Sequence, residues 1–180
     1  MYELNRDAFH KATPLLDDLS EAQQVLVQAV LVGNHMGRIF VDDLDAPSNA
    51  LLYAACDFII LVGAADNDDF NRAWHKALTT EILPGAWLFF MDPDAQWNAV
   101  LDRLFVGSKF HRVPRYTFEL DKERFQTQAH PPVCADFEVR PYDRELAAGA
   151  RGLAELWGGL DNFLADGLGV AVLHGDEAVS

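Results

Sequence analysis

The sequence predicts an α+β protein in which a mixed, mostly antiparallel sheet is flanked by helices. Short runs rich in β-branched and aromatic residues, at residues 38–41 and 50–62, are bounded by polar turn residues, as is typical of strands. Residues 70–83 and 94–105 repeat apolar side chains at helical spacing. Half of the 180 residues are hydrophobic and 23% are charged, which indicates a chain with a buried core.

The first 41 residues contain the most ambiguous run of the chain. Residues 3–19 carry apolar side chains at roughly helical spacing, and Ser20 followed by Gln23 is typical of a capping box. In residues 25–32, Leu, Ala and Gln favour a helix, whereas four valines favour a strand. We predict a strand for at least the second half of this run. It would form a hairpin with residues 38–41 through a turn that has glycines at both ends.

The middle of the chain alternates predicted strands and helices. Residues 50–62 form one or two strands closed by Gly63, and residues 70–83 form a helix that Pro84 and Gly85 end. A short buried strand at residues 87–91, a helix at 94–105 and a strand at 110–120 follow.

A break in regular structure at residues 126–136 divides the chain. We predict a first domain at residues 1–125, a linker at 126–136 and a second unit at 137–180. The second unit consists of a strand at 137–141, helices at 144–157 and 160–164, and a hairpin that turns at Gly175 and Asp176. Because the last strand has only just begun at the final residue, we expect an unpaired edge, an incomplete unit, and a fragment or shortened gene product.

Both units resemble parts of the GCN5-related N-acetyltransferase (GNAT) family. In that family the domain opens with a strand of the form x-hydrophobic-Arg-Pro, as in Glu138-Val139-Arg140-Pro141, and its second and third strands form a hairpin of the form G-x-x-V-x-x-G-E/D-x-V, similar to residues 169–179. Residues 33–43 are similar to the G-N-x-x-G-x-I-x-V-D-D hairpin in the N-terminal domain of a two-domain bacterial group. The resemblance implies a GNAT-like fold and, in the first unit, a degenerate copy of it.

The resemblance implies that the chain is the N-terminal portion of an acetyl-CoA-dependent N-acetyltransferase that acts on a small amine-bearing substrate. In this family a Q/R-x-x-G-x-G/A loop at a helix N-terminus holds the cofactor diphosphate. The sequence contains no such loop. We therefore expect that this chain alone binds no acetyl-CoA and is inactive, and we assign no cofactor-binding or catalytic residue.

The alternative is a non-catalytic module that binds a small ligand or mediates pairing. An open sheet edge near Val170 and Val179 could be completed by a second copy, which would give a homodimer.

Four residues are candidates for a substrate pocket. Asn34 and His35 lie at a predicted turn, where His35 is either a general base or a solvated turn residue. Asp42 and Asp43 end a predicted strand, where they bind a cation or an amine substrate, or else brace the loop.

Composition excludes several classes of partner. Twenty-eight acidic residues against 14 Lys and Arg give a formal charge of −14, so we expect neither nucleic-acid nor anionic-membrane binding. The two cysteines lack zinc-site spacing, and we expect no metal. No run is apolar enough to span a membrane, and the first residues mix charges of both signs, so we expect a cytoplasmic protein. A basic stretch could contact a phosphate or form a solvated face: Arg103, Lys109, His111, Arg112 and Arg115.

Overall fold

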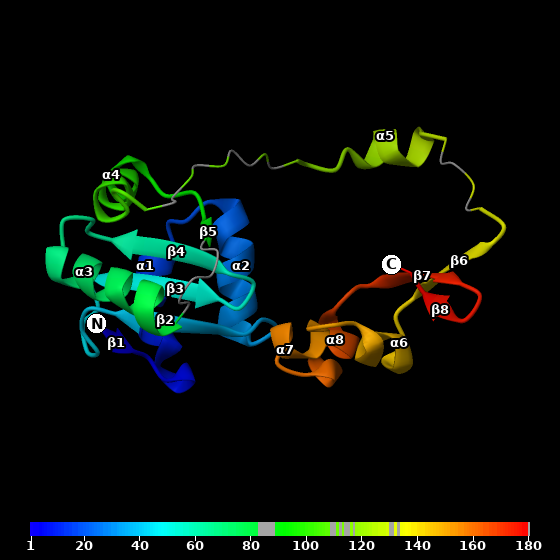
Figure 1. Cartoon of the computed structure of the whole chain (residues 1–180), viewed down its shortest axis with the longest axis horizontal. Coiled ribbons are helices and arrows are strands. Elements are labelled where there is room, and N and C mark those ends of the chain that lie inside the picture. Colours follow the sequence, from blue (N-terminus) through cyan, green and yellow to red (C-terminus); the bar gives the residue numbers. More distant parts are fainter. Residues whose placement is uncertain are drawn as a thin grey trace. The chain divides into compact units, whose positions relative to one another are not determined.

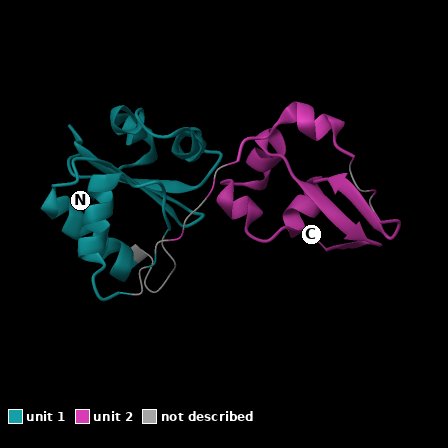
Figure 2. Cartoon of the chain, turned by 90° about the horizontal axis from the view of Figure 1, so that it is seen from above, with its two compact units in different colours: residues 1–111 teal, residues 112–180 magenta. Residues whose placement is uncertain are grey.

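The computed structural model describes residues 1–82, 89–108, 118–129 and 134–179, together with residues 111, 113, 116 and 132. It divides into two compact units, Met1–His111 and Arg112–Ser180 (Figure 2). The division falls before the boundary at residue 125 that the sequence predicts, and residues 126–136 belong to the second unit. Each unit is described by itself below.

Unit 1 contains a five-stranded mixed sheet, which confirms the predicted fold class. Strands β1 to β4 pair antiparallel in sequence order, and β4 pairs with β5 in parallel. The strands are β1 (Tyr2–Glu3), β2 (Gly37–Val41), β3 (Asn49–Ala54), β4 (Phe58–Gly63) and β5 (Phe89–Phe90) (Figure 1).

Helices cover both faces of this sheet, because neighbouring residues of each central strand belong to different buried clusters. Ile39, Leu52 and Ile60 pack in one cluster with residues of the N-terminal helices η1 (Arg6–Lys11), α1 (Thr13–Leu16) and α2 (Glu21–Val32). The adjacent residues Phe40, Leu51 and Ile59 pack in the other cluster. That cluster includes residues of α3 (Asp68–Lys76), the π-helix η2 (Ala77–Ile82) and α4 (Ala95–Leu104). Unit 1 is therefore a three-layer structure.

The predicted strand in residues 25–32 is wrong, because this run is the C-terminal part of α2. The capping box fixes the start of the helix: the N–H of Gln23 donates to Ser20 Oγ (3.3 Å), and the N–H of Ser20 donates to Gln23 Oε1 (3.0 Å). Val27 and Val30 are buried at helical spacing, and Gly33 ends the helix with φ of 94°. Consequently β2 pairs with β1 and β3, and not with residues 25–32.

The strands and helices after β2 largely match the prediction. Residues 50–62 form the hairpin β3–β4, and α4 is capped by Asp94, whose carboxylate accepts the N–H of Trp97 (2.8 Å). The helix predicted at 70–83 begins earlier, at Asp68, and continues as η2. Its predicted stop at Pro84 and Gly85, and part of the strand predicted at 87–91, lie outside the described residues.

The strand predicted at residues 110–120 does not form in the described part of that segment. Residues 111, 113, 116 and 118–120 carry no strand pairing, and the others lie outside the described residues. Tyr116, Phe118 and Leu120 are 78%, 87% and 65% exposed. Their alternating apolar pattern has no sheet to pack on here, and alternation alone does not make a strand.

Unit 2 has the predicted order of strand, helices and hairpin. Its antiparallel sheet has the order β6-β7-β8, and its buried apolar residues are Ala171 and Leu173 of β7 and Ala147 and Phe163 of the helices. The helix predicted at 144–157 is two helices, because the backbone is extended at Ala150 and left-handed at Gly152. The elements are α5 (Lys122–Thr127), β6 (Phe137–Pro141), α6 (Arg144–Gly149), α7 (Leu153–Leu156), α8 (Leu160–Asp166), β7 (Val170–His174) and β8 (Glu177–Ala178).

Among the helices of the described ranges, none is both long and apolar enough to cross a membrane.

Candidate functional site

The four predicted pocket residues lie at the two ends of β2. Asn34 and His35 precede the strand, and Asp42 and Asp43 follow it. At roughly 3.3 Å per residue, a five-residue strand holds the two pairs about 16 Å apart or more. The structure therefore does not bring them together into one pocket.

Asp42 is the centre of a hydrogen-bonded loop. Its Oδ1 accepts the N–H groups of Ser48 and Asn49, each at 2.9 Å. Its Oδ2 accepts Ser48 Oγ (2.5 Å) and the amide Nδ2 of Asn67 (3.3 Å). Burial raises the pKa of Asp42, but the hydrogen bonds from Ser48 and Asn49 outweigh it and leave the pKa below its ordinary value. The carboxylate is thus ionised and occupied by the protein's own donors.

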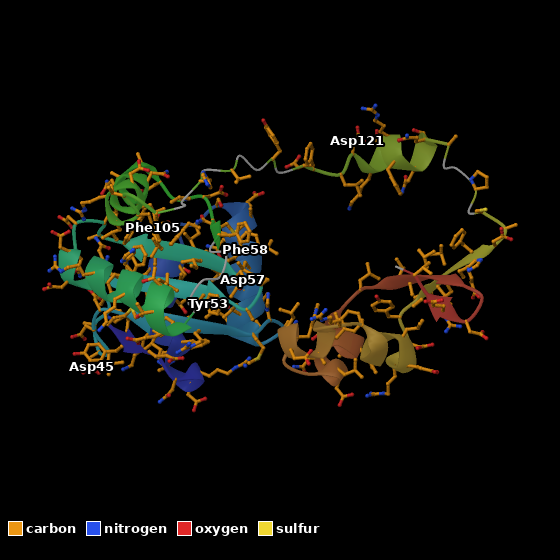
Figure 3. The ribbon with its side chains drawn as sticks, viewed as in Figure 1. Asp45, Tyr53, Asp57, Phe58, Phe105 and Asp121 are labelled. Carbon is orange, nitrogen blue, oxygen red and sulfur yellow. The ribbon has the colours of Figure 1, made fainter. Side chains whose placement is uncertain are left out.

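Asp43 closes the same loop from its exposed side. Its Oδ1 accepts the N–H groups of Ala46 (2.9 Å) and Asp45 (2.8 Å), and these bonds lower its pKa. Asp45 follows on the loop (Figure 3), and Lys11 Nζ donates to its carboxylate (3.3 Å). These contacts favour the loop-bracing interpretation of Asp42 and Asp43.

A buried asparagine extends this network to the next turn, and the sequence did not identify it. Asn49 is 0% exposed, its Nδ2 donates to the carbonyl oxygen of Ala64 (2.6 Å), and its Oδ1 accepts Asn67 Nδ2 (3.2 Å). The sequence signal that could have identified it is an amide side chain directly before a long apolar run. The network joins the β2–β3 loop to the turn between β4 and α3.

His35 helps to end helix α2. Its N–H donates to the carbonyl oxygen of Ala29 (2.9 Å), and the side chains of Asn34 and His35 are half-buried. Asn34 and His35 therefore have a structural role in the turn that joins α2 to β2.

A second polar group lies at the other end of the β3–β4 hairpin. Tyr53 Oη donates to Asp57 Oδ1 (3.4 Å), and both residues are labelled in Figure 3. Burial and the neighbouring Asp57 raise the pKa of Tyr53, so its hydroxyl is protonated at neutral pH. It is a hydrogen-bond donor rather than a base.

The junction between β4 and α3 is the position that the topology favours for a ligand. Strands β4 and β5 are parallel and α3 connects them, and in such units ligands bind beyond the carboxyl end of a strand, at a helix N-terminus. A groove of about 490 Å³ lies here. It is lined by Ala65, Asp66, Asp68, Gln96, Ala99, Val100 and Arg103.

The guanidinium group of Arg103, which lines this groove, is already paired with a carboxylate. Its Nη2 donates to Asp68 Oδ1 (2.7 Å), which accounts for one member of the predicted basic stretch. His111 is exposed, and Lys109, Arg112 and Arg115 lie outside the described residues.

The comparisons with known proteins agree with this architecture. A family profile described as GNAT acetyltransferase matches residues 16–180. The crystal structure of a GCN5-related N-acetyltransferase-like protein from Streptococcus suis 89/1591 aligns with a TM-score of 0.66 at 21% identity. That alignment covers 97% of this chain and 68% of the other, and at this identity it shows the fold alone. No curated protein matches the chain.

The mixed sheet of unit 1 and the strand, helix and hairpin order of unit 2 define a GNAT-like α+β protein. The chain belongs to the GNAT acetyltransferase family, since the family profile covers most of its length.

This family typically uses acetyl-CoA, and the residues at the β4–α3 junction do not fit the cofactor's diphosphate. The turn carries Asp66, and the first helical turn carries Asp68 and Asp69. Asn67 caps the helix with its own side chain, whose Oδ1 accepts the N–H of Phe70 (3.1 Å). An anion would meet carboxylates and an occupied cap rather than a cradle of open amides.

Proposed function

We propose that this chain is part of an N-acetyltransferase that transfers the acetyl group of acetyl-CoA to the amine of a small substrate. The family match across residues 16–180 is the observation that carries the proposal. The order of a strand, helices and a hairpin in unit 2 supports it, because the sequence resemblance implies this general order for the start of an acetyltransferase domain.

We further propose that the chain is inactive by itself. The sequence has no Q/R-x-x-G-x-G/A loop, and the described β4–α3 junction does not suit a diphosphate.

The test combines binding with turnover. The 180-residue chain is titrated with acetyl-CoA by calorimetry, and release of the free thiol is followed with a panel of primary amines. We expect neither heat of binding nor thiol release above the enzyme-free rate. Tight binding with turnover would refute the proposed inactivity and would support the acetyltransferase assignment.

A separate experiment tests the acetyltransferase assignment itself. The reading frame downstream of codon 180 is sequenced, and the longest product is assayed with the same amines. A Q/R-x-x-G-x-G/A loop and acetyl transfer would support the assignment, and a product that carries the loop without any transfer would contradict it.

A second candidate function is pairing of two copies through unit 2. By register, Val139 lies opposite Val172, and Phe137 and Val170 share their face of the sheet. Phe137, Val139 and Val170 are 40%, 47% and 57% exposed. By register, His174 and Glu177 lie at one end of this face, next to Phe137. We propose that these exposed apolar side chains, beside the edge near Val170 and Val179, would allow a homodimer of this acidic chain.

Sedimentation velocity tests this pairing. We expect a concentration-dependent dimer that Val139→Lys abolishes, whereas Glu138→Lys, on the opposite face of the same strand, leaves it intact. A strict monomer at high concentration, or equal effects of the two substitutions, would contradict the proposal.

We also propose that the protein acts in the cytoplasm and binds neither nucleic acid nor membranes, as its charge of −14 predicts. Cell fractionation and a nucleic-acid mobility assay at low salt would check these two points.

A further inference from the structure

We propose that unit 1 excludes the diphosphate of acetyl-CoA from its own strand-to-helix junction, through the carboxylates at the start of α3. The inference rests on the proposed use of acetyl-CoA. Unit 1 has the topology for an anion site, since β4, α3 and the parallel strand β5 follow in order. Three features of the residues at the β4–α3 junction oppose the binding of a diphosphate there.

The glycine at the end of β4 serves an internal contact. Gly63 has a φ of 93°, and a β-carbon there would overlap the carbonyl oxygen of Ser48. In a phosphate-binding turn, a missing side chain leaves room for the anion to approach the backbone. Here the β2–β3 loop fills that room.

Three of the junction's amide donors already have protein acceptors. The N–H of Asn67 donates to the carbonyl oxygen of Ala64 (3.3 Å), and the N–H of Asn71 donates to the carbonyl oxygen of Asn67 (2.9 Å). The N–H of Phe70 donates to the side chain of Asn67 (3.1 Å). Within the first turn of α3, the donors that a ligand could still use are the amides of Asp68 and Asp69.

The charges around those two amides repel an anion. Arg103 pairs with Asp68 and Arg72 pairs with Asp69, so both arginines are engaged by carboxylates. Asp66 lines the groove, and the ionised Asp42 lies 3.3 Å from the side chain of Asn67. A diphosphate in the groove would meet these negative charges at short range, where screening by salt is weakest.

The test follows backbone amides of the full chain by NMR during titration with inorganic pyrophosphate, and then with acetyl-CoA. At about 10 mM, a site with a Kd of about 1 mM would be nine-tenths filled. We expect no saturable shift at residues 66–70 with either probe. A saturable shift of the Asp68 and Asp69 amides with pyrophosphate would overturn the proposal.

Charge-reversed variants test the cause. Asp66→Lys with Asp69→Lys is expected to gain a saturable pyrophosphate shift at the Asp68 amide. The single Asp66→Lys variant, which keeps the pair between Asp69 and Arg72, is expected to show a weaker one. The control, Asp17→Lys with Asp18→Lys, changes the net charge equally at two exposed positions beside α1 and is expected to gain none at residues 66–70. Circular dichroism checks folding, and folded variants without the gain would overturn the role of charge.

The acetyl-CoA titration separates this inference from the proposed function. Shifts confined to residues 137–179 would support both cofactor use and exclusion from unit 1. No shift anywhere would support exclusion together with inactivity of the isolated chain. Shifts at residues 66–70 would overturn the exclusion while supporting cofactor use.

Discussion

Asp42 shows why a carboxylate at a strand end need not be a ligand site. Its oxygens accept donors from Ser48, Asn49 and Asn67, and those donors come from two different loops. A charged acceptor in such a network is roughly twice as strong as a neutral one. The residue therefore holds the β2–β3 loop against the β4–α3 turn.

Replacement of Asp42 is expected to change the pH dependence of stability. The folded-state pKa of Asp42 is lowered, so its stabilisation is present above the unfolded-state pKa of about 3.9 and is lost as pH falls through the folded value. We expect Asp42→Asn to lower the free energy of unfolding by about 1 to 2 kcal/mol at pH 7, and by less below pH 4. Urea denaturation at several pH values measures this difference. Asp45→Asn, at an exposed position of the same loop, is the control, and a difference for Asp42→Asn that does not vary with pH would contradict the prediction.

Gly63 permits a comparison of two glycines with similar backbone angles. Gly63 and Gly107 have φ of 93° and 77°, so alanine is strained at both positions by about 1 to 2 kcal/mol. Of the two, Gly63 is the one where a β-carbon overlaps other atoms, since at Gly107 no atom of the described residues beyond its two chain neighbours lies within 4 Å of such a carbon. We expect Gly63→Ala to lower the free energy of unfolding by at least about 2 kcal/mol more than Gly107→Ala. Equal losses in urea denaturation would show that the packing of Ser48 against Gly63 is not tight.

At the scale of elements, the sequence predicts those whose signals are local. The cap of α2 and the turn at Gly175 are chemical signals within a few residues, and they appear as expected. The valines of α2 misled the prediction, because burial against the sheet outweighs intrinsic preference. Asn49 could not be linked to Ala64 from sequence, since that contact depends on the register of β3 against β4. The site was therefore harder to predict than the fold.

The capping box of α2 gives a prediction for a whole helix. Ser20→Ala removes the acceptor for the N–H of Gln23 at the first turn. We expect a loss of about 1 kcal/mol in the free energy of unfolding, since N-cap serines are typically worth that much. Ser108→Ala removes an exposed hydroxyl that donates to the carbonyl oxygen of Phe105, and we expect a smaller change. Equal losses of unfolding free energy for Ser20→Ala and Ser108→Ala would show that the N-cap does not stabilise α2 more than an ordinary exposed hydrogen bond.

At the scale of the whole molecule, the excess of acidic residues dominates the electrostatics. The chain carries a formal charge of −14. The ion pairs of the described residues join side chains that are at least 35% exposed, where each pair is worth about 0 to 1 kcal/mol. We therefore expect repulsion among the excess carboxylates to outweigh the attraction within the pairs.

This balance predicts that salt stabilises the protein at neutral pH. Raising NaCl from about 0.01 M to 0.15 M shortens the screening length from about 30 Å to 8 Å, which weakens repulsion between distant carboxylates more than attraction within close pairs. We expect the Tm to rise by a few degrees at pH 7, measured by circular dichroism. At about pH 4, where carboxylates with ordinary pKa values are near half-protonated, the rise is expected to be much smaller. A Tm that falls with NaCl at pH 7 would show that the exposed ion pairs, rather than the net charge, govern stability.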